Sequence, residues 1–212
     1  ARTHDGLEVA VKVRRPGIEA LVARDLDLLE AFVRGARASL PPSDWDTIVR
    51  EVRAMVLAEL DYEGERRPME RVGAFFAAGP LEGIRVPAAV PERCTARVLV
   101  SSFERGDKIT DALDALRDAG AHDRVSTILG RLIEAYVAQV LEAGVFQADP
   151  HPGNFLVAEG DALVVLDFGC AKELPREVRD GYLALVQAAL LSDRARVVAE
   201  LLPEAAPLED LA

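Results

Sequence analysis

The sequence predicts an α+β fold with two lobes, and three observations support it. A strand-like segment followed by long helical segments opens the chain, and a mostly helical half closes it. A β-rich run from Arg97 to Val100, with a turn at Glu104-Arg105-Gly106, separates these parts and predicts a hinge. We therefore expect one lobe over residues 1–103 and a second, mainly helical lobe over residues 104–212.

Composition and charge describe a globular chain without a general affinity for polyanions. Half of the 212 residues are apolar, 29% are charged, and the formal net charge is −11. We therefore expect no nucleic-acid partner, and an anionic ligand must be held by specific groups or metal ions. Cys94 and Cys170 have no metal-type spacing, and no run reaches the ~20 apolar residues of a membrane span. These features predict a cytoplasmic protein with reduced thiols.

The first half is predicted to contain one strand and two helices. Residues Leu7 to Val13 alternate between apolar and polar, as a strand does, and Pro16-Gly17 ends that strand. Apolar residues then recur with a helical period from Ile18 to about Ala38, where Pro41-Pro42 ends the helix. A second, long helix is expected over residues 43–76, although a glycine and a proline inside it weaken its continuity.

The second half is predicted to be helical around one β-hairpin. Residues 79–91 are rich in Gly and Pro and predict a loop with a short strand. A broad apolar face predicts a helix from Asp111 to Ala143. Two short strands, Asn154 to Val157 and Leu163 to Leu166, are joined by a turn that contains glycine, and the segment from Arg176 to Leu202 is helical again.

Three polar residues around the predicted hairpin carry the strongest chemical signal. Asn154 follows Asp149 by five positions, and Asp167 begins an Asp-Phe-Gly sequence directly after the second strand. Because a hairpin returns the chain to its origin, Asn154 and Asp167 can converge on one ion, and their oxygens suit Mg²⁺. Asp149 can then orient or deprotonate an attacking hydroxyl. A tight loop would also use such prolines, glycine and asparagine, but the combined spacing is that of protein kinases.

Lys12 and a group of acidic residues form the second signal. Lys12 stands in the predicted strand, where kinases place a lysine that holds phosphates and pairs with a helix glutamate. On a helix Asp61 and Glu65 share a face, whereas Glu59 points elsewhere. Taken alone, the lysine would be an ordinary surface residue and the acidic cluster a solvated face. With the downstream motif, Glu65 is the expected partner of Lys12.

Four segments together resemble the UbiB/AarF/ADCK family of atypical kinases: Val9–Gly17, Glu59–Tyr62, Ala148–Asn154 and Asp167–Gly169. The resemblance runs from about Asp5 to Leu202. It implies a protein-kinase-like fold with a helical insertion after the lysine strand, and binding of Mg²⁺ with ATP or ADP. It also implies ATPase activity or kinase chemistry on a small molecule or lipid, in support of isoprenoid quinone (ubiquinone) or lipid metabolism. The implied partners are a lipid or quinone-pathway molecule, the membrane periphery, or a biosynthetic complex.

The same resemblance implies a role for each matching residue. The catalytic residues would be Asp149, Lys12 and Glu65; the cofactor would be contacted by Lys12, Glu59 and Asp61; and the metal ligands would be Asn154 and Asp167. Two family elements, an Ala-rich nucleotide loop and a KxGQ element, do not occur in this sequence. We therefore expect a truncated N-terminal lobe, in which the acidic ExD pair of Glu59 and Asp61 lacks the element that it normally meets.

Two other functions are compatible with these residues. A phosphotransferase of the aminoglycoside- or choline-kinase type has a similar catalytic loop, although Gly169 and the Pro16-Gly17 end of the lysine strand favour the atypical kinases. A nucleotide-binding pseudokinase or scaffold would keep the metal and nucleotide site without turnover. Measurements of nucleotide binding and of ATPase activity distinguish an enzyme from such a scaffold.

Overall fold

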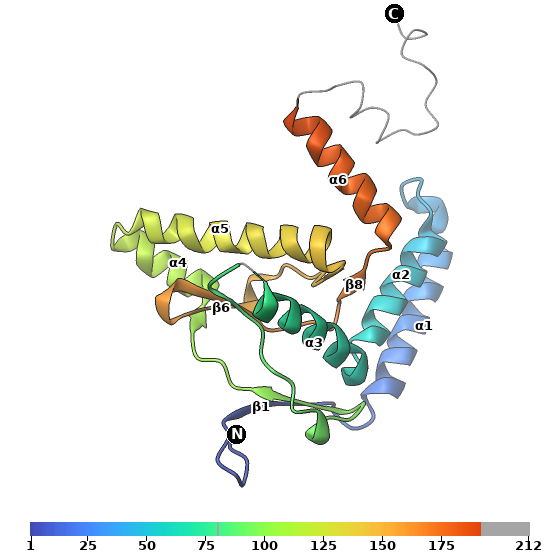
Figure 1. Cartoon of the computed structure of the whole chain (residues 1–212). Coiled ribbons are helices and arrows are strands. Elements are labelled where there is room, and N and C mark those ends of the chain that lie inside the picture. The colour runs from blue at the N-terminus through green and yellow to red at the C-terminus, as the bar shows by residue number, and fades with distance from the viewer. Residues whose placement is uncertain (80, 192–212) are drawn as a thin grey trace, which may run out of the picture.

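The computed structural model describes residues 1–79 and 81–191, which form a mixed arrangement of helices and short strands (Figure 1). A two-stranded ladder lies at one end of the molecule, and a four-stranded sheet with its covering helices lies at the other. Two helices that pack against each other stand at the side (Figure 1). The mixture of helix and sheet agrees with the predicted class.

The N-terminal ladder places Lys12 within a strand. Strand β1 (Val9–Val13) pairs antiparallel with β3 (Val98–Ser102), and Lys12 lies opposite Leu99. The side chain of Val9 is buried, whereas that of Lys12 is half-buried. The alternation of apolar and polar residues from Leu7 to Val13 predicted β1, and the β-rich run from Arg97 to Val100 predicted β3.

Two helices are inserted between this ladder and the helix that follows. Helix α1 (Ile18–Ala36) begins after the Pro16-Gly17 turn, as predicted. A short 3₁₀ turn, η1 (Arg37–Ser39), leads to α2 (Trp45–Ala58), whose first turn is capped by the side chain of Asp44.

The predicted single helix over residues 43–76 is wrong, because the chain breaks it in two. Helix α2 ends at Ala58, and the amides of Leu60 and Asp61 bond three residues back, which tightens the last turn. Asp61 then takes up an extended conformation and caps α3 (Tyr62–Ala78). Hydrophobic periodicity does not distinguish a capping carboxylate from one on a helix surface, so the break was not visible in the pattern. The glycine and the proline inside α3 do not interrupt it.

The predicted single helix from Asp111 to Ala143 is also wrong. The structure divides it into α4 (Ile109–Asp118) and α5 (His122–Ala138), followed by a π-helical turn, η3 (Gln139–Ala143). Gly120 lies between α4 and α5 with a φ of 69°, a left-handed conformation that glycine adopts freely. The apolar period continues across this glycine and concealed the break.

The C-terminal sheet has four strands in the order β2-β7-β6-β4. These strands are β2 (Ile84–Arg85), β4 (Asp107–Lys108), β6 (Phe155–Ala158) and β7 (Ala162–Val165). Strands β6 and β7 form the predicted hairpin around the turn η5 (Glu159–Asp161). The amide of Leu166 donates to the carbonyl of Asn154 at 2.9 Å, so the hairpin brings together the residues that precede and follow it.

Short elements connect this sheet to the rest of the chain. Strand β5 (Val145–Phe146) pairs with β8 (Lys172–Glu173), and two 3₁₀ turns are η2 (Pro91–Arg93) and η4 (Pro152–Asn154). Helix α6 (Arg176–Leu190) extends away from the body (Figure 1). The remainder of the helix predicted there lies outside the described residues.

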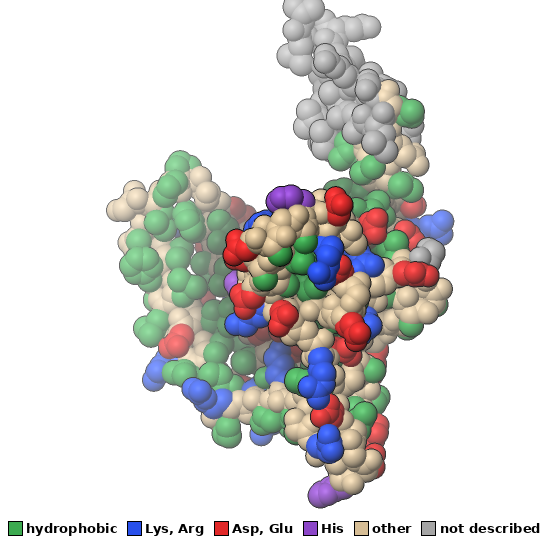
Figure 2. Space-filling view, turned by 90° about the vertical axis from the view of Figure 1, so that its left-hand side faces the viewer, with side chains coloured by type: hydrophobic (Ala, Val, Ile, Leu, Met, Phe, Trp, Pro, Cys, Tyr) green, Lys and Arg blue, Asp and Glu red, His purple; other side chains and the backbone are tan. Residues whose placement is uncertain are grey.

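The core lies where α3 and α5 meet the sheet. Its most deeply buried side chains include Met69, Val72, Ile128, Phe155, Leu163 and Phe168. On the surface, acidic and basic side chains are interspersed over the central part of the face shown in Figure 2, whereas hydrophobic side chains prevail on its left-hand part. None of the helices within the described residues combines the length and the apolar character needed to cross a bilayer.

Candidate active site

A cavity of about 340 Å³ opens between the β1–β3 ladder, α3 and the β6–β7 hairpin. Apolar side chains from both strands of the ladder and from the hairpin form one part of its wall. The polar part contains Lys12, Glu65, Asn154 and Asp167. Four of the seven residues that the sequence singled out therefore line one cavity.

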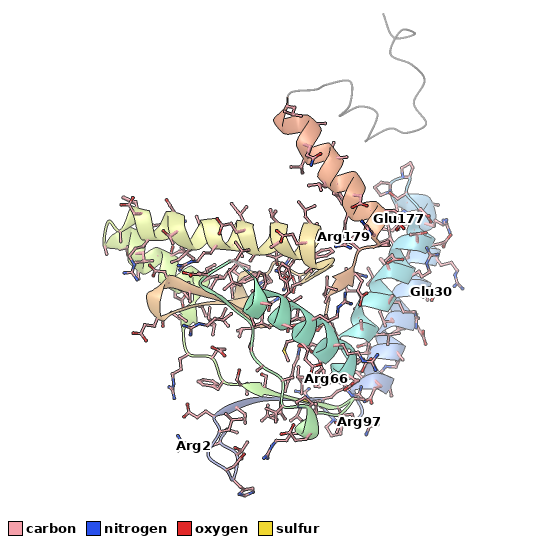
Figure 3. All side chains as sticks on the ribbon, viewed as in Figure 1. Arg2, Glu30, Arg66, Arg97, Glu177 and Arg179 are labelled. Carbon is pink, nitrogen blue, oxygen red and sulfur yellow. The ribbon has the colours of Figure 1, made fainter. Side chains whose placement is uncertain are left out.

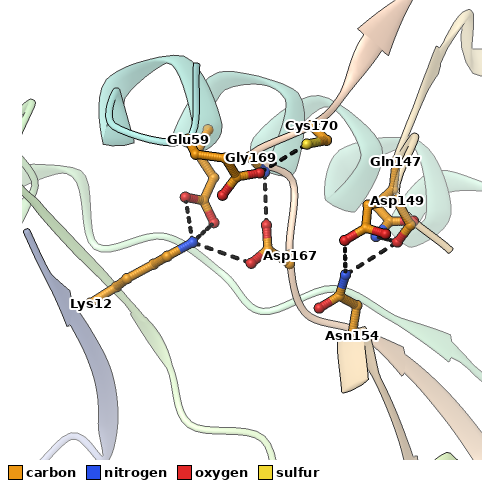
Figure 4. Close-up of polar contacts among 9 residues, drawn as sticks. Lys12, Glu59, Gln147, Asp149, Asn154, Asp167, Gly169 and Cys170 are labelled. Carbon is orange, nitrogen blue, oxygen red and sulfur yellow. Dashed lines mark hydrogen bonds and ion pairs between the residues drawn. The ribbon is translucent and has the colours of Figure 1, made fainter. Parts of the chain in front are cut away.

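Lys12 reaches two carboxylates at the wall of this cavity (Figure 4). Its Nζ lies 2.8 Å from Oε2 and 3.0 Å from Oε1 of Glu65, and 3.2 Å from Oδ2 of Asp167. Glu65 is only 3% exposed. The Tyr62 ring also faces the ammonium, whose nitrogen lies 5.2 Å from the ring centroid. Strand β1, helix α3 and the Asp-Phe-Gly loop thus meet at one cation.

Burial and pairing act in opposite directions on this cluster. Burial lowers the pKa of Lys12, but the bonds and charges of Glu65 and Asp167 outweigh it, and the pKa of Lys12 is raised. Burial raises the pKa of Glu65 above its ordinary value, against the attraction of Lys12. Lys12 is therefore held as a cation, and Glu65 depends on it to remain a carboxylate.

The side-chain amide of Asn154 connects the residues of the predicted catalytic loop. Its Nδ2 donates to Oδ2 and to the carbonyl oxygen of Asp149, both at 3.1 Å. Its Oδ1 lies on the other side of the amide, away from Asp149 (Figure 4). Asp149 is exposed and stands outside the cavity lining, to which Asn154 and Asp167 belong. The structure thus brings Asn154 and Asp167 to the cavity and sets Asp149 beside them.

The oxygen groups at this point suit a magnesium ion that shares its other ligands with a phosphate. Asp167 accepts a bond from the Gly169 amide at 2.8 Å through Oδ1, and its Oδ2 faces Lys12. Among the described residues, no three His, Cys, Asp or Glu side chains converge as a metal-binding group. Mg²⁺ commonly takes one or two protein oxygens and completes its shell with phosphate oxygens and water. Asp167 and Asn154 fit that pattern.

Glu59 and Asp61 have different surroundings, although the sequence paired them. Asp61 caps α3, since its Oδ1 accepts a bond from the Glu63 amide at 3.2 Å, and it does not line the cavity. Because Asp61 precedes the helix, the expectation that it shares a helix face with Glu65 is wrong. The carboxylate of Glu59 packs against the Asp-Phe-Gly loop, where a Cβ on Gly169 would lie 2.9 Å from both of its oxygens. A side chain at position 169 would therefore require the Glu59 carboxylate to shift.

Replacing Asp61 by Ala is expected to destabilise the fold by about 1 kcal/mol, because the Glu63 amide loses its side-chain acceptor. Asp61→Asn keeps an acceptor and should remain within about 0.5 kcal/mol of the native chain. Urea unfolding of both variants measures the difference. Equal losses in the two variants would show that the charge of Asp61, and not the cap, is what stabilises this position.

Cys170 follows the Asp-Phe-Gly sequence and contacts Glu59. Its Sγ donates to Oε1 of Glu59 at 2.9 Å (Figure 4). Burial, the bond to Glu59 and the nearby charges of Asp149 and Asp167 raise the pKa of this thiol to about 12. The thiol is therefore protonated at neutral pH and is a weak nucleophile.

Glu59→Gln is expected to lower the pKa of Cys170 and so to speed its alkylation. Below its pKa, the thiolate fraction rises about tenfold for each unit by which that pKa falls. The rate of reaction with iodoacetamide at about pH 9, followed by mass spectrometry of the Cys170 peptide, measures the change. Cys94 serves as the internal control, and its rate should be unchanged. An unaltered Cys170 rate would show that Glu59 does not suppress the thiolate.

Two buried glutamines, which the sequence did not mark as site residues, hold the predicted catalytic loop. Gln147 is 1% exposed; its Nε2 donates to the carbonyl of Asp149, and its Oε1 accepts from the Tyr136 hydroxyl. The backbone amide of Gln147 donates to Oε1 of Gln139 at 3.1 Å. Gln139 itself donates to the Ala135 carbonyl at 3.1 Å. A glutamine within an otherwise apolar helix face is the signal that would have identified Gln139.

Comparison with known proteins shows which family and which proteins this chain is similar to. A family model described as the ABC1 atypical kinase-like domain matches residues 1–201. The chain is 32% identical over 202 residues to ACTIVITY OF BC1 COMPLEX KINASE 7, chloroplastic, from Arabidopsis thaliana. It is 30% identical over 198 residues to AarF domain-containing protein kinase 1 from Xenopus tropicalis. These matches cover 94% and 91% of this chain but only 28% and 37% of the relatives' own lengths.

A solved structure shows the same fold. The chain matches the protein Rv3197 of Mycobacterium tuberculosis, whose structure is a complex with erythromycin, with a TM-score of 0.65. The match covers 93% of this chain and 49% of that protein, at 22% sequence identity. At this identity the likeness concerns the fold alone.

Proposed function

Because the chain belongs to the ABC1 atypical kinase-like family, we propose that it binds Mg²⁺ with ATP or ADP and acts as a phosphotransferase or ATPase. The resemblance to the UbiB/AarF/ADCK family is confirmed by the family match and by relatives named as AarF domain-containing kinases. The observation that carries the proposal is the position of Lys12, which reaches both Glu65 and Asp167 at the wall of one cavity.

The apolar part of the cavity is proposed to hold the base of the nucleotide. Ala10 and Leu99 line it from the ladder, and Leu156 and Leu166 line it from the hairpin. The segment from Ser101 to Glu104 runs along one edge, where backbone groups can bond to a base. A volume of about 340 Å³ falls within the range of small-molecule sites, which begins at about 300 Å³.

The polar part is proposed to hold the phosphates and the metal. Lys12 would bind phosphate oxygens, and Glu65 would position its ammonium. Asn154 and Asp167 would hold Mg²⁺, which when bound neutralises charge on the phosphates. Asp149 is proposed to orient and deprotonate an attacking hydroxyl.

The remaining two acidic residues are proposed to act at different distances from the cofactor. Glu59 would act on it through the Asp-Phe-Gly loop, because its carboxylate packs against Gly169. Asp61 would act only through α3, whose first turn it caps and whose Glu65 faces Lys12.

We also propose that the cavity separates two lobes of a kinase-like fold, with the described residues of the ranges 1–103 and 104–212 on either side and α1–α2 as the helical insertion. The ladder of β1 and β3 belongs to the first lobe, and the β6–β7 hairpin to the second. Strand β2 lies in the first range but pairs with β7, so one short strand crosses this boundary.

The wider role is proposed to be support of isoprenoid quinone or lipid metabolism. The family resemblance supports this role, with a lipid or a quinone-pathway molecule as the acceptor and the membrane periphery or a biosynthetic complex as the place of action. Quinone content in cells that lack the gene, with and without a copy carrying Asp149→Asn, tests it. Phosphorylation of an aminoglycoside or choline with unchanged quinone levels would instead favour the soluble-substrate kinases.

Thermal unfolding with and without nucleotide tests the binding proposal. At a Mg-ATP or Mg-ADP concentration of about 100 times Kd, binding to the folded state adds about 2.7 kcal/mol. For a chain of this length that corresponds to a rise in Tm of about 5–10 °C. Asp167→Asn should abolish the rise. Asp118→Asn, an exposed charge change at the end of α4, is the matched control and should retain it. An unchanged Tm for the native chain would contradict nucleotide binding.

A further inference from the structure

The turn between β1 and α1 forms a small basic cavity that is separate from the candidate active site. It has a volume of about 140 Å³ and is lined by Arg14, Arg15, Pro16, Gly17, Glu19 and Arg97. Three arginines and one glutamate therefore line this cavity, in a chain whose net charge is −11. Figure 3 shows Arg97 near the end of α1 that is closest to the ladder.

The three arginines differ in how many of their guanidinium N–H donors already bond to other groups of the chain. Arg14 donates to Oε1 of Glu19 at 2.7 Å and to the carbonyl of Leu60. Arg97 lies 3.7 Å from the same glutamate oxygen, which is too long for a hydrogen bond. Arg15 forms no ion pair within the part of the chain that the structure describes. Two guanidinium groups therefore retain donors that can turn towards the cavity.

From this geometry we propose that the cavity binds a phosphate group, either free or carried by a monoester. Planar guanidinium forks match phosphate oxygens in pairs, which makes arginine the usual residue for this task. A volume of about 140 Å³ equals that of roughly four or five water molecules, at ~30 Å³ each. That is room for one phosphate, but it is well below the ~300 Å³ at which sites for whole small molecules begin.

Glu19 sets the strength of this site. Its carboxylate lies beside the guanidinium groups of Arg14 and Arg97 and neutralises part of their positive charge. A phosphate must therefore displace the Glu19 carboxylate or bind to the same two arginines together with it. The N-terminal end of α1 adds a smaller positive field, because no side chain caps the helix there. The arginines supply the larger part of the attraction, and removing the charge of Glu19 should strengthen it.

A phosphate titration at constant ionic strength tests the site on the full chain. Chemical shifts of the arginine Nε–H groups and of the amides near Gly17 report the binding. Arg15→Ala should weaken the affinity about tenfold, whereas Glu19→Gln should tighten it. Arg24→Ala is the matched control, because Arg24 is exposed on α1 and, within the described residues, forms an ion pair with Asp25 alone, at 3.8 Å. It should leave the affinity within about twofold.

Three outcomes would overturn the proposal: no binding of phosphate, an equal loss in the Arg15 and Arg24 variants, or a weaker affinity in Glu19→Gln. Circular dichroism confirms that each variant is folded. The arginine Nε–H groups and the amides near Gly17 report this site, which separates it from the proposed nucleotide site around Lys12. Glycerol 3-phosphate, and phosphatidylcholine vesicles with and without phosphatidic acid, identify whether the phosphate comes from a soluble ester or a lipid headgroup.

Discussion

Asp149→Asn is expected to slow ATP turnover by about 10²- to 10⁴-fold while leaving the affinity for Mg-ATP within about threefold of the native value. Asp149 stands beside the cavity and not in its lining, so its loss should not remove a contact to the nucleotide. An asparagine there keeps an oxygen that can accept the bond from Asn154 but cannot take a proton. Phosphate release measures turnover, and calorimetric titration measures affinity.

The same pair of measurements separates an enzyme from a sensor. If turnover falls less than about threefold in Asp149→Asn, Asp149 is not the general base. If the native chain binds Mg-ATP but releases no phosphate above the uncatalysed rate, the scaffold interpretation is favoured. Asp118→Asn is again the control and should change neither quantity, because Asp118 is exposed at the end of α4.

Lys12→Met is expected to destabilise the fold by about 2–3 kcal/mol near neutral pH. The substitution leaves Glu65, which is only 3% exposed, without its cation. Removing one partner of a fully buried pair costs about 3–5 kcal/mol. We expect a smaller loss of about 2–3 kcal/mol here, because the Lys12 side chain is 36% exposed and solvent screens its charge. Urea unfolding at several pH values measures the loss.

The loss in Lys12→Met should depend on pH in a defined direction. Burial raises the pKa of Glu65 above its ordinary value of 4.5, and without Lys12 nothing opposes that shift. A carboxyl whose pKa is raised on folding destabilises the fold only at a pH at which it must ionise. The stability deficit of Lys12→Met is therefore small below about pH 4.5, where Glu65 is protonated. The deficit grows as the pH rises through the pKa of Glu65 in the folded variant.

Two further variants control this result. The double variant Lys12→Met/Glu65→Gln should recover much of the stability at neutral pH, because it removes the buried charge. Lys172→Met changes an exposed lysine on β8 and should have little effect at any pH. A deficit in Lys12→Met that is independent of pH would show that lost packing, and not the unpaired Glu65, is responsible.

Local sequence patterns predicted the elements whose ends are encoded nearby. Strand β1 follows an alternation of apolar and polar residues, and α1 begins at a Pro-Gly turn, so both were predicted within a few residues. The divisions between α2 and α3 and between α4 and α5 were missed. Each depends on a single residue, Asp61 as a cap and Gly120 in a left-handed conformation, while the apolar period continues past it.

The candidate site was predictable where a hairpin or a motif determines it. The proximity of Asn154 and Asp167 follows from the hairpin between them, and the Lys12–Glu65 contact was expected from the motif. The contact of Glu59 with the Asp-Phe-Gly loop and the bonds of Gln147 depend on how α2 and α5 pack. No spacing in the sequence encodes those contacts. The roles of these residues in binding and catalysis stay predictions.

The dependence of ATP affinity on Mg²⁺ tests most directly whether the cavity of Lys12, Asn154 and Asp167 is a metal-nucleotide site. Calorimetric titration of the full chain with ATP, once with Mg²⁺ and once with EDTA, gives the two affinities. We predict that Mg²⁺ tightens ATP binding about tenfold or more in the native chain, and that Asp167→Asn loses this gain. Equal affinities with Mg²⁺ and EDTA, or an unchanged gain in Asp167→Asn, would contradict the account.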